Sequence, residues 1–365
     1  MNKIKTIVTD LFPNVSFALI RWRKYDAKKL DSYINIRYPK ENENKFKLKA
    51  LMKFCWVFLG IRYWEFYGMH LEKKKMKQVL DFVPRWEEED LYFQVNDKKY
   101  VGLLENKFKC YNFFKDYYKR KAVLVSRSDK GEYSGEVRGF IEDNDSFIIK
   151  PIASYCGQGV KIVNAANEKR IEDLLGDYSG DVIIEELIKQ DSRLAAFHYN
   201  SVNTIRIFTI NYGNSIEVKW PTFRIGRGNA TMDNLACGGI GVTVDEKTGM
   251  TIRAADERGN VFLRHPDTNT NLIGFAMPEW DSLCQSVKEM AAMCPDCPIM
   301  GWDMALTDDG WCVVECNYGP GIIYQYANQS GVRKDFKAIR KRLGAKRGKH
   351  FADTKHISRY LIKPM

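Results

Sequence analysis

Short apolar runs between turn-forming residues occupy most of the chain after residue 120, and this pattern predicts a series of β-strands. The segment Trp280–Met293 predicts a helix among them. Residues 1–100 lack an alternating strand–helix pattern, and their sequence is typical of helices. The predicted strands lie at 121–125, 147–151, 161–163, 181–188, 201–210, 220–226, 242–244 and, as a hairpin, within 299–317.

The hairpin segment 299–321 contains the strongest chemical signal. An Asp-Gly pair in the turn Thr307–Gly310 joins two apolar strands, which favours a tight hairpin. Glu315 and Asn317 are two residues apart and so share one face of their strand. The hairpin can bring Asp303 opposite them. Three oxygen-donating side chains on one face predict a site for a hard cation such as magnesium.

The alternative for this hairpin is that its acids are simply solvated. The apolar neighbours Met304 and Val314 disfavour that alternative. A charge placed among apolar side chains is costly unless it is paired or bound to a metal.

Two other features indicate an anion site. Lys150 closes one predicted strand, and the loop 154–160 after it contains two glycines. Glycines let backbone amides approach an anion closely, and a lysine adds a point charge; the alternative is an ordinary hairpin turn. Arg206 lies within an apolar strand, where an arginine holds either an anion or a structural salt-bridge partner.

The two ends of the chain are basic. Residues 1–100 contain 21 basic and 13 acidic residues, a net charge of +8. Within them Leu51–His70 is the most apolar stretch, and a core helix is favoured over a segment lying on a membrane surface. The acidic run Glu87–Asp90 is expected to be a solvated helix start or loop. After Gly331 the tail predicts a basic amphipathic helix, either packed on the body or meeting an acidic polymer or lipid headgroups.

Composition sets wider limits. The chain has 365 residues, 45% hydrophobic and 28% charged, which suits a soluble protein of two or three domains. The net charge of +11 suggests an anionic partner, but nucleic-acid binding rests on charge alone and is not favoured. Nine scattered cysteines indicate a reducing compartment rather than a disulfide scaffold. With no signal-peptide core and no apolar run of 18 residues, a cytoplasmic protein is expected, with a peripheral position at the inner membrane face as the alternative.

The order of these parts resembles the ATP-grasp superfamily over about residues 100–330. A lysine ends a strand, a glycine loop follows, and a strand ending in two glutamates precedes an arginine strand and the Asp…Glu-x-Asn hairpin. The segments 201–209, 224–239 and 301–317 are most similar to the sugar-transfer associated ATP-grasp branch. The resemblance implies an α+β fold in which two lobes grip ATP, here with a helical N-terminal region.

The resemblance also implies site roles. Asp303, Glu315 and Asn317 correspond to the Mg²⁺ ligands, and Arg206, Arg224 and Asn234 to groups on the phosphate and acceptor side. The implied nucleotide contacts are the lysines Lys107 and Lys150, the loop residues Ser154, Gly157, Gln158 and Gly159, the adenine hinge Glu185, Glu186 and Leu187, and Asp191 or Ser192 at the ribose.

The resemblance divides the chain into four parts and implies one reaction. The parts are a basic helical region 1–100, a small nucleotide lobe 101–188, a metal-binding lobe 189–331 and a basic tail 332–365. The implied enzyme is an ATP- and Mg²⁺-dependent ligase that activates a carboxylate as an acyl-phosphate and passes it to an amine or hydroxyl acceptor.

The branch name alone suggests a sugar or polysaccharide precursor as the acceptor, with contact to glycan-synthesis machinery. Two alternatives stay open: a kinase acting on a hydroxyl, and a polymer- or membrane-binding protein with a non-catalytic nucleotide lobe. Many ATP-grasp enzymes carry a Rossmann-like domain before the nucleotide lobe, and this chain has none of its pattern there, so the sequence leaves the acceptor open.

Overall fold

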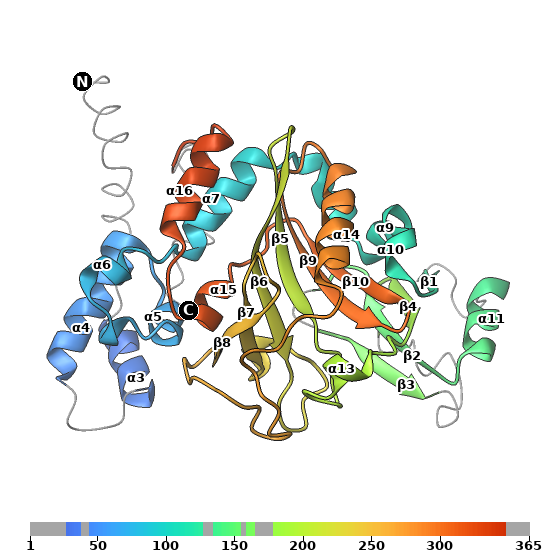
Figure 1. Cartoon of the computed structure of the whole chain (residues 1–365), viewed down its shortest axis with the longest axis horizontal. Helices are drawn as coiled ribbons and strands as arrows, with labels where there is room; N and C mark the ends of the chain where they lie inside the picture. The colour runs from blue at the N-terminus through green and yellow to red at the C-terminus, as the bar shows by residue number, and fades with distance from the viewer. Residues whose placement is uncertain (1–26, 38–43, 127–133, 155–157, 165–177, 348–365) are drawn as a thin grey trace.

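The computed structural model shows two antiparallel sheets and a helical N-terminal region, as Figure 1 illustrates. This arrangement confirms the predicted α+β class. The described residues are 27–37, 44–126, 134–154, 158–164 and 178–347.

The smaller sheet has four strands in the order β1-β4-β2-β3. Helix α11 (Gly135–Asp143) packs on it through Val137 and Phe140, which share a core with the apolar side chains of the strands. The strands of this smaller sheet match the predicted strands closely. They are β1 (Ala122–Val125), β2 (Ser146–Pro151), β3 (Lys161–Asn164) and β4 (Val182–Glu186).

The larger sheet has six strands in the order β10-β9-β5-β6-β7-β8. Helix α14 (Trp280–Ala292) packs on this sheet, and its Leu283, Val287 and Met290 are fully buried. The strands are β5 (Ile205–Asn211), β6 (Ile216–Ile225), β7 (Ile240–Val244), β8 (Thr251–Asp256), β9 (Ile299–Thr307) and β10 (Gly310–Asn317). The predicted hairpin is therefore confirmed, with its turn between β9 and β10.

Short helices before β1 belong to the core of the larger sheet. The ring of Phe114 meets Trp302 of β9 edge to face, with centroids 5.3 Å apart. These helices thus bring the segment before the small sheet against the hairpin. They are η3 (Lys98–Tyr100), α8 (Val101–Leu104), α9 (Lys107–Phe113) and α10 (Lys115–Tyr118).

The N-terminal helices form a separate core. The predicted core helix Leu51–His70 is indeed buried along much of its length, but it is broken. A π-helical turn follows α4, and Gly60 adopts a left-handed conformation with φ of 71° that ends it. The elements are α3 (Ala27–Arg37), α4 (Lys45–Phe54), η1 (Cys55–Leu59), α5 (Tyr63–Gly68), η2 (Leu71–Lys73) and α6 (Met76–Val79).

Helix α7 (Arg85–Val95) corrects one prediction. The acidic run expected to be solvated lies within it, and all four acids are buried. Arg340 of α16 (Arg333–Arg342) pairs with Asp90 at 2.8 Å, and Arg333 pairs with Glu87 at 2.9 Å. The partners are about 250 residues away in sequence, so the run alone could not show them. The basic helix α16 is packed on the body through these pairs.

Three short helices complete the described chain: α13 (Ser192–Ala195), η5 (Leu235–Cys237) and α15 (Tyr324–Asn328). Within the described ranges, every helix is too short or too polar to span a lipid bilayer.

The Asp90–Arg340 pair gives a test of this packing. Because Asp90 is fully buried, Arg340→Met should remove a cationic partner of this carboxylate and lower the free energy of unfolding by about 3–5 kcal/mol. Lys337→Met, an exposed position on the same helix, should change it by less than about 0.5 kcal/mol. Urea unfolding of both variants measures the difference. Equal losses would show that the buried pair does not hold α16 in place.

Candidate active site

A row of charged side chains crosses three neighbouring strands of the larger sheet. The register pairs Glu315 of β10 with Asp303 of β9, and Asp303 with Arg206 of β5. Directly opposed residues of antiparallel strands project from the same face. The sheet order therefore brings three predicted site residues together, although they are far apart in sequence.

Asp303 is the centre of this row. Its carboxylate is 3% exposed and accepts from Arg206 Nη2 at 2.8 Å, while Arg206 Nε also donates to its other oxygen. Arg224 Nη2 lies 2.9 Å from the same carboxylate. Burial acts to raise the pKa of Asp303, but the two guanidinium charges outweigh it and lower the pKa. The result is an ionised carboxylate bridging two buried cations.

Asp233 extends the network and was not predicted from sequence. Its Oδ2 lies 3.5 Å from Arg224 Nε and accepts from the backbone N of Thr204 at 2.9 Å. Thr204 Oγ1 in turn accepts from Arg224 Nε at 3.0 Å. Burial raises the pKa of Asp233. Its place in the loop before the glycine pair was the available signal, but the prediction chose its neighbour Asn234.

Glu315 and Asn317 lie half-buried beside this network. Burial and then the charge of Asp303 raise the pKa of Glu315. Asn317 Nδ2 is buried without a hydrogen-bond partner among the described residues. A buried carboxylate next to another carboxylate is the group that a cation would stabilise. The oxygens of Glu315 and Asn317 therefore fit a hard cation, whereas Asp303 is already engaged by both arginines.

A second ionic cluster lies on the small sheet. Glu185 at the end of β4 accepts from Lys150 at 3.0 Å and from Arg120 at 2.6 Å. Burial alone would raise the pKa of Glu185, but the charges of Arg120 and Lys150 hold it at about 2. Arg120 also donates to the backbone oxygen of Val313 on β10 at 2.5 Å. Arg120 thus joins the two sheets, and no local sequence signal marked it.

A small cavity lies between the two clusters. Lys107, at the start of α9, borders it and donates to the backbone oxygen of Ser154 at 2.7 Å. Burial lowers the pKa of Lys107. The cavity connects predicted nucleotide residues with the predicted metal strand. Its lining residues are Leu104, Lys107, Cys110, Tyr118, Glu185, Val314, Glu315 and Cys316.

The predicted phosphate loop is described only in part. Gly159 has φ of 74°, a left-handed conformation that favours glycine, and its backbone oxygen accepts from Tyr178 Oη at 2.9 Å. Gln158 is exposed. Gly157 lies outside the described residues.

Four further predicted residues, like several of those above, are not among the residues that line the cavity. Asp191 caps α13 and pairs with Arg193 at 2.8 Å. Asn234 caps η5 by accepting from the backbone N of Ala236. The other two follow the hinge: Glu186 accepts from the backbone N of Lys121, and Leu187 is half-buried just after β4.

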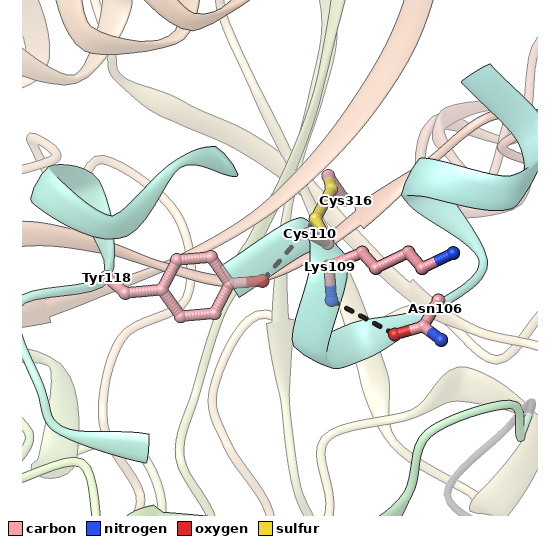
Figure 2. Close-up of a disulfide and its surroundings, with 5 residues drawn as sticks. All are labelled: Asn106, Lys109, Cys110, Tyr118 and Cys316. Carbon is pink, nitrogen blue, oxygen red and sulfur yellow. Dashed lines mark hydrogen bonds between the residues drawn. A yellow bond between two sulfur atoms is a disulfide. The ribbon is translucent and has the colours of Figure 1, made fainter. Parts of the chain in front are cut away.

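Two cysteines that line the cavity lie close together. Figure 2 shows a disulfide between Cys110 of α9 and Cys316 of β10, whose Cα atoms are 7.5 Å apart. Asn106 caps the helix at this point by accepting from the backbone N of Lys109 at 3.0 Å. The cysteines are 206 residues apart, so their spacing gave no sign of pairing. The bond joins the helix of Lys107 to the strand that carries Glu315 and Asn317.

Comparison with known proteins identifies the family of this chain. A sequence profile of the family described as sugar-transfer associated ATP-grasp matches residues 87–341, well over half of the chain. The chain belongs to this family. The matched range of this ATP-grasp protein begins in α7 and ends in α16, so it contains both sheets and the buried acid–arginine pairs. No curated protein matches the chain at the significance required.

Three solved ligases are similar to parts of the chain at low sequence identity. The D-alanine–D-alanine ligase of Helicobacter pylori is 16% identical with a TM-score of 0.39, over 66% of this chain and 57% of that one. The VanG D-Ala:D-Ser ligase of Enterococcus faecalis is 13% identical with a TM-score of 0.45, over 68% and 64%. The D-alanine–D-alanine ligase of Coxiella burnetii is 12% identical with a TM-score of 0.42, over 73% and 64%. The chain thus spans between 57% and 64% of the length of these ligases.

The Glu185 cluster predicts a pH-dependent contribution to stability. The pKa of Glu185 falls from the usual 4.5 to about 2 on folding, so its stabilising charge is fully present above about pH 5 and is lost as the pH falls toward 2. Glu185→Gln should therefore lower the free energy of unfolding by about 3 kcal/mol at pH 7.

Urea unfolding at pH 7 and near pH 3 measures this effect. The gap in the free energy of unfolding between the wild type and Glu185→Gln should narrow at the lower pH, because near pH 3 the unfolded chain binds a proton at this carboxyl while the folded protein does not. Glu136→Gln, at an exposed position of α11, serves as the control and should show no such gap. A gap of the same size at both pH values would contradict the ionised state of Glu185.

Proposed function

We propose that the chain is an ATP- and Mg²⁺-dependent ligase that activates a carboxylate as an acyl-phosphate. The observation that carries this proposal is Asp303, which holds Arg206 and Arg224 in place beside the open oxygens of Glu315 and Asn317. This arrangement places two fixed guanidinium groups beside side chains that could bind a metal cation. It suits a reaction in which negative charge builds up on a transferred phosphoryl group.

The lysines supply the nucleotide side of the site. Lys107 and Lys150 converge on the cavity region from α9 and β2, and a nucleoside triphosphate brings several negative charges that they would offset. Glu185 keeps Lys150 fixed at 3.0 Å rather than free to rotate. The hinge residues Glu186 and Leu187 would present backbone groups to the adenine.

A magnesium ion would be held by Glu315 and Asn317, with Asp303 next to them. Bound there, the ion would neutralise phosphate charge and orient the phosphoryl group for transfer. Arg206 and Arg224 are buried, preorganised donors that would hold the phosphoryl oxygens and then the acyl-phosphate. Asp303 prevents both guanidinium groups from turning away.

The substrates are a carboxylate and an amine or hydroxyl acceptor. The family description supports a sugar-linked acceptor such as a polysaccharide precursor. The convergence of Asp303, Glu315 and Asn317 disfavours the alternative of a binding protein with a non-catalytic nucleotide lobe. A buried cluster of this kind is costly to keep unless it is used or fully paired, and Asn317 Nδ2 remains without a partner among the described residues.

Removing a single cation ligand tests the metal assignment. Glu315→Gln should weaken Mg²⁺-dependent binding of a non-hydrolysable ATP analogue by about 10- to 100-fold, because a carboxamide lacks the charge that holds the ion. Asp308→Asn, in the exposed turn of the same hairpin, should leave binding unchanged. Calorimetric titration with and without Mg²⁺ measures both variants. Unchanged Mg²⁺ dependence in Glu315→Gln would remove Glu315 from the metal site.

The fate of labelled γ-phosphate separates a ligase from the alternative kinase. We expect ADP and free inorganic phosphate to form only when a carboxylate and an amine or hydroxyl acceptor are both present, because the acyl-phosphate passes its acyl group onward. A screen of substrate pairs, with products identified by mass, makes this measurement. Label retained on a stable hydroxyl-phosphorylated product would instead establish a kinase.

A further inference from the structure

Helix α4 and the following turn η1 carry a row of three phenylalanines, spaced eight and four residues apart. Phe46 is 83% exposed and Phe58 is 48% exposed. Phe54 lies between them in sequence; it is half-buried and packs against the N-terminal core, and its ring centroid is 5.3 Å from that of Phe58. The other face of the same segment contributes Met52 and Trp56 to the N-terminal core. A surface helix of a soluble protein normally turns polar residues outward, so the outward aromatic row indicates a contact with something apolar.

Helix α6 and its flanking residues also expose apolar side chains, here together with lysines. Met76 is 45% exposed and Leu80, which follows the helix, is 44% exposed. Lys73, Lys75 and Lys77 around them are all exposed. Figure 1 shows α4 and α6 at the end of the molecule remote from the small sheet. Exposed apolar side chains and lysines therefore occur together at one end of the protein.

Charge is concentrated in the same segment. Residues 44–80 contain nine lysines and arginines and two acids, a net charge of +7 out of +11 for the whole chain. Thirty-seven residues thus carry most of the excess positive charge. A segment that combines exposed apolar side chains with a high positive charge is complementary to a partner that has an anionic surface over an apolar interior.

We propose that this docking face, formed by Phe46, Phe54, Phe58, Met76, Leu80 and their flanking lysines, binds the surface of an anionic lipid bilayer. The apolar side chains would enter the boundary between headgroups and acyl chains, and the lysines would meet lipid phosphates. A soluble polyanion would engage the lysines but leave the phenylalanines in water. The aromatic row is therefore what favours a bilayer as the partner.

The helices that carry the docking face are packed on the larger lobe. Leu235 and Tyr326 belong to the same core as the N-terminal helices. Leu235 directly follows Asn234, and Tyr326 lies in α15, just after the strand that carries Asn317. The docking face is therefore fixed to the lobe that carries the candidate site.

Vesicle co-sedimentation of the full chain tests the docking directly. The wild type should sediment with vesicles of phosphatidylglycerol and phosphatidylcholine, should not sediment with phosphatidylcholine alone, and should bind less as salt rises. The double variant Phe46→Asp/Phe58→Asp should lose at least tenfold in affinity. Leu263→Asp, at a position 75% exposed in the larger lobe, is the control and should bind like the wild type. Circular dichroism confirms that each variant is folded.

Three outcomes would overturn the proposal. The wild type could fail to bind the anionic vesicles, or the double phenylalanine variant could bind them as well as the wild type does. The chain could also bind polyphosphate or heparin equally well in both forms while ignoring vesicles, which would make the face a polyanion site. Because the assay contains no nucleotide, a negative result would leave the ligase assignment intact, and loss of that assignment would leave the docking result intact.

Discussion

The carboxylate of Asp303 is the constraint on which the site depends. Two guanidinium groups and one carboxylate are buried together, and each is tolerable there only because the others are present. Their positions follow from strand order, since β9 lies between β10 and β5. A strand slipped by one residue would turn Asp303 away from Arg206 and leave both charges buried and unpaired. The charge row therefore specifies the register of the central strands as well as the chemistry.

The same reasoning explains the second cluster. Glu185 is buried on the small sheet and is stable as an anion only because Arg120 and Lys150 face it. Arg120 also reaches the backbone of Val313 on the larger sheet. The two charge clusters are thus held at a fixed separation across the cavity, as a protein that grips a nucleotide between two lobes requires. The N-terminal helices contribute from outside by packing behind Leu235 and Tyr326.

Local patterns predicted what depends on neighbours in sequence. The Asp-Gly turn and the alternation around it identified the hairpin, whereas the irregularity between Val313 and Glu315 that brings Glu315 opposite Asp303 had no sequence signal. Partners distant in sequence could not be predicted. Glu87 was expected to be solvated because its partner Arg333 lies 246 residues away. Asp233 and Arg120 were missed for the same reason. The proximity of Cys110 and Cys316 was also not predictable from local patterns, because they are 206 residues apart in sequence.

One measurement tests the account most directly: a crystal structure of the chain with a non-hydrolysable ATP analogue and Mg²⁺. The account predicts the cation between the phosphates and the oxygens of Glu315 and Asn317, with Arg206 and Arg224 still paired to Asp303 and facing the γ-phosphate. The adenine should lie beside Glu186 and Leu187. A cation bound away from β10, or a triphosphate that does not approach the two arginines, would contradict the central claim.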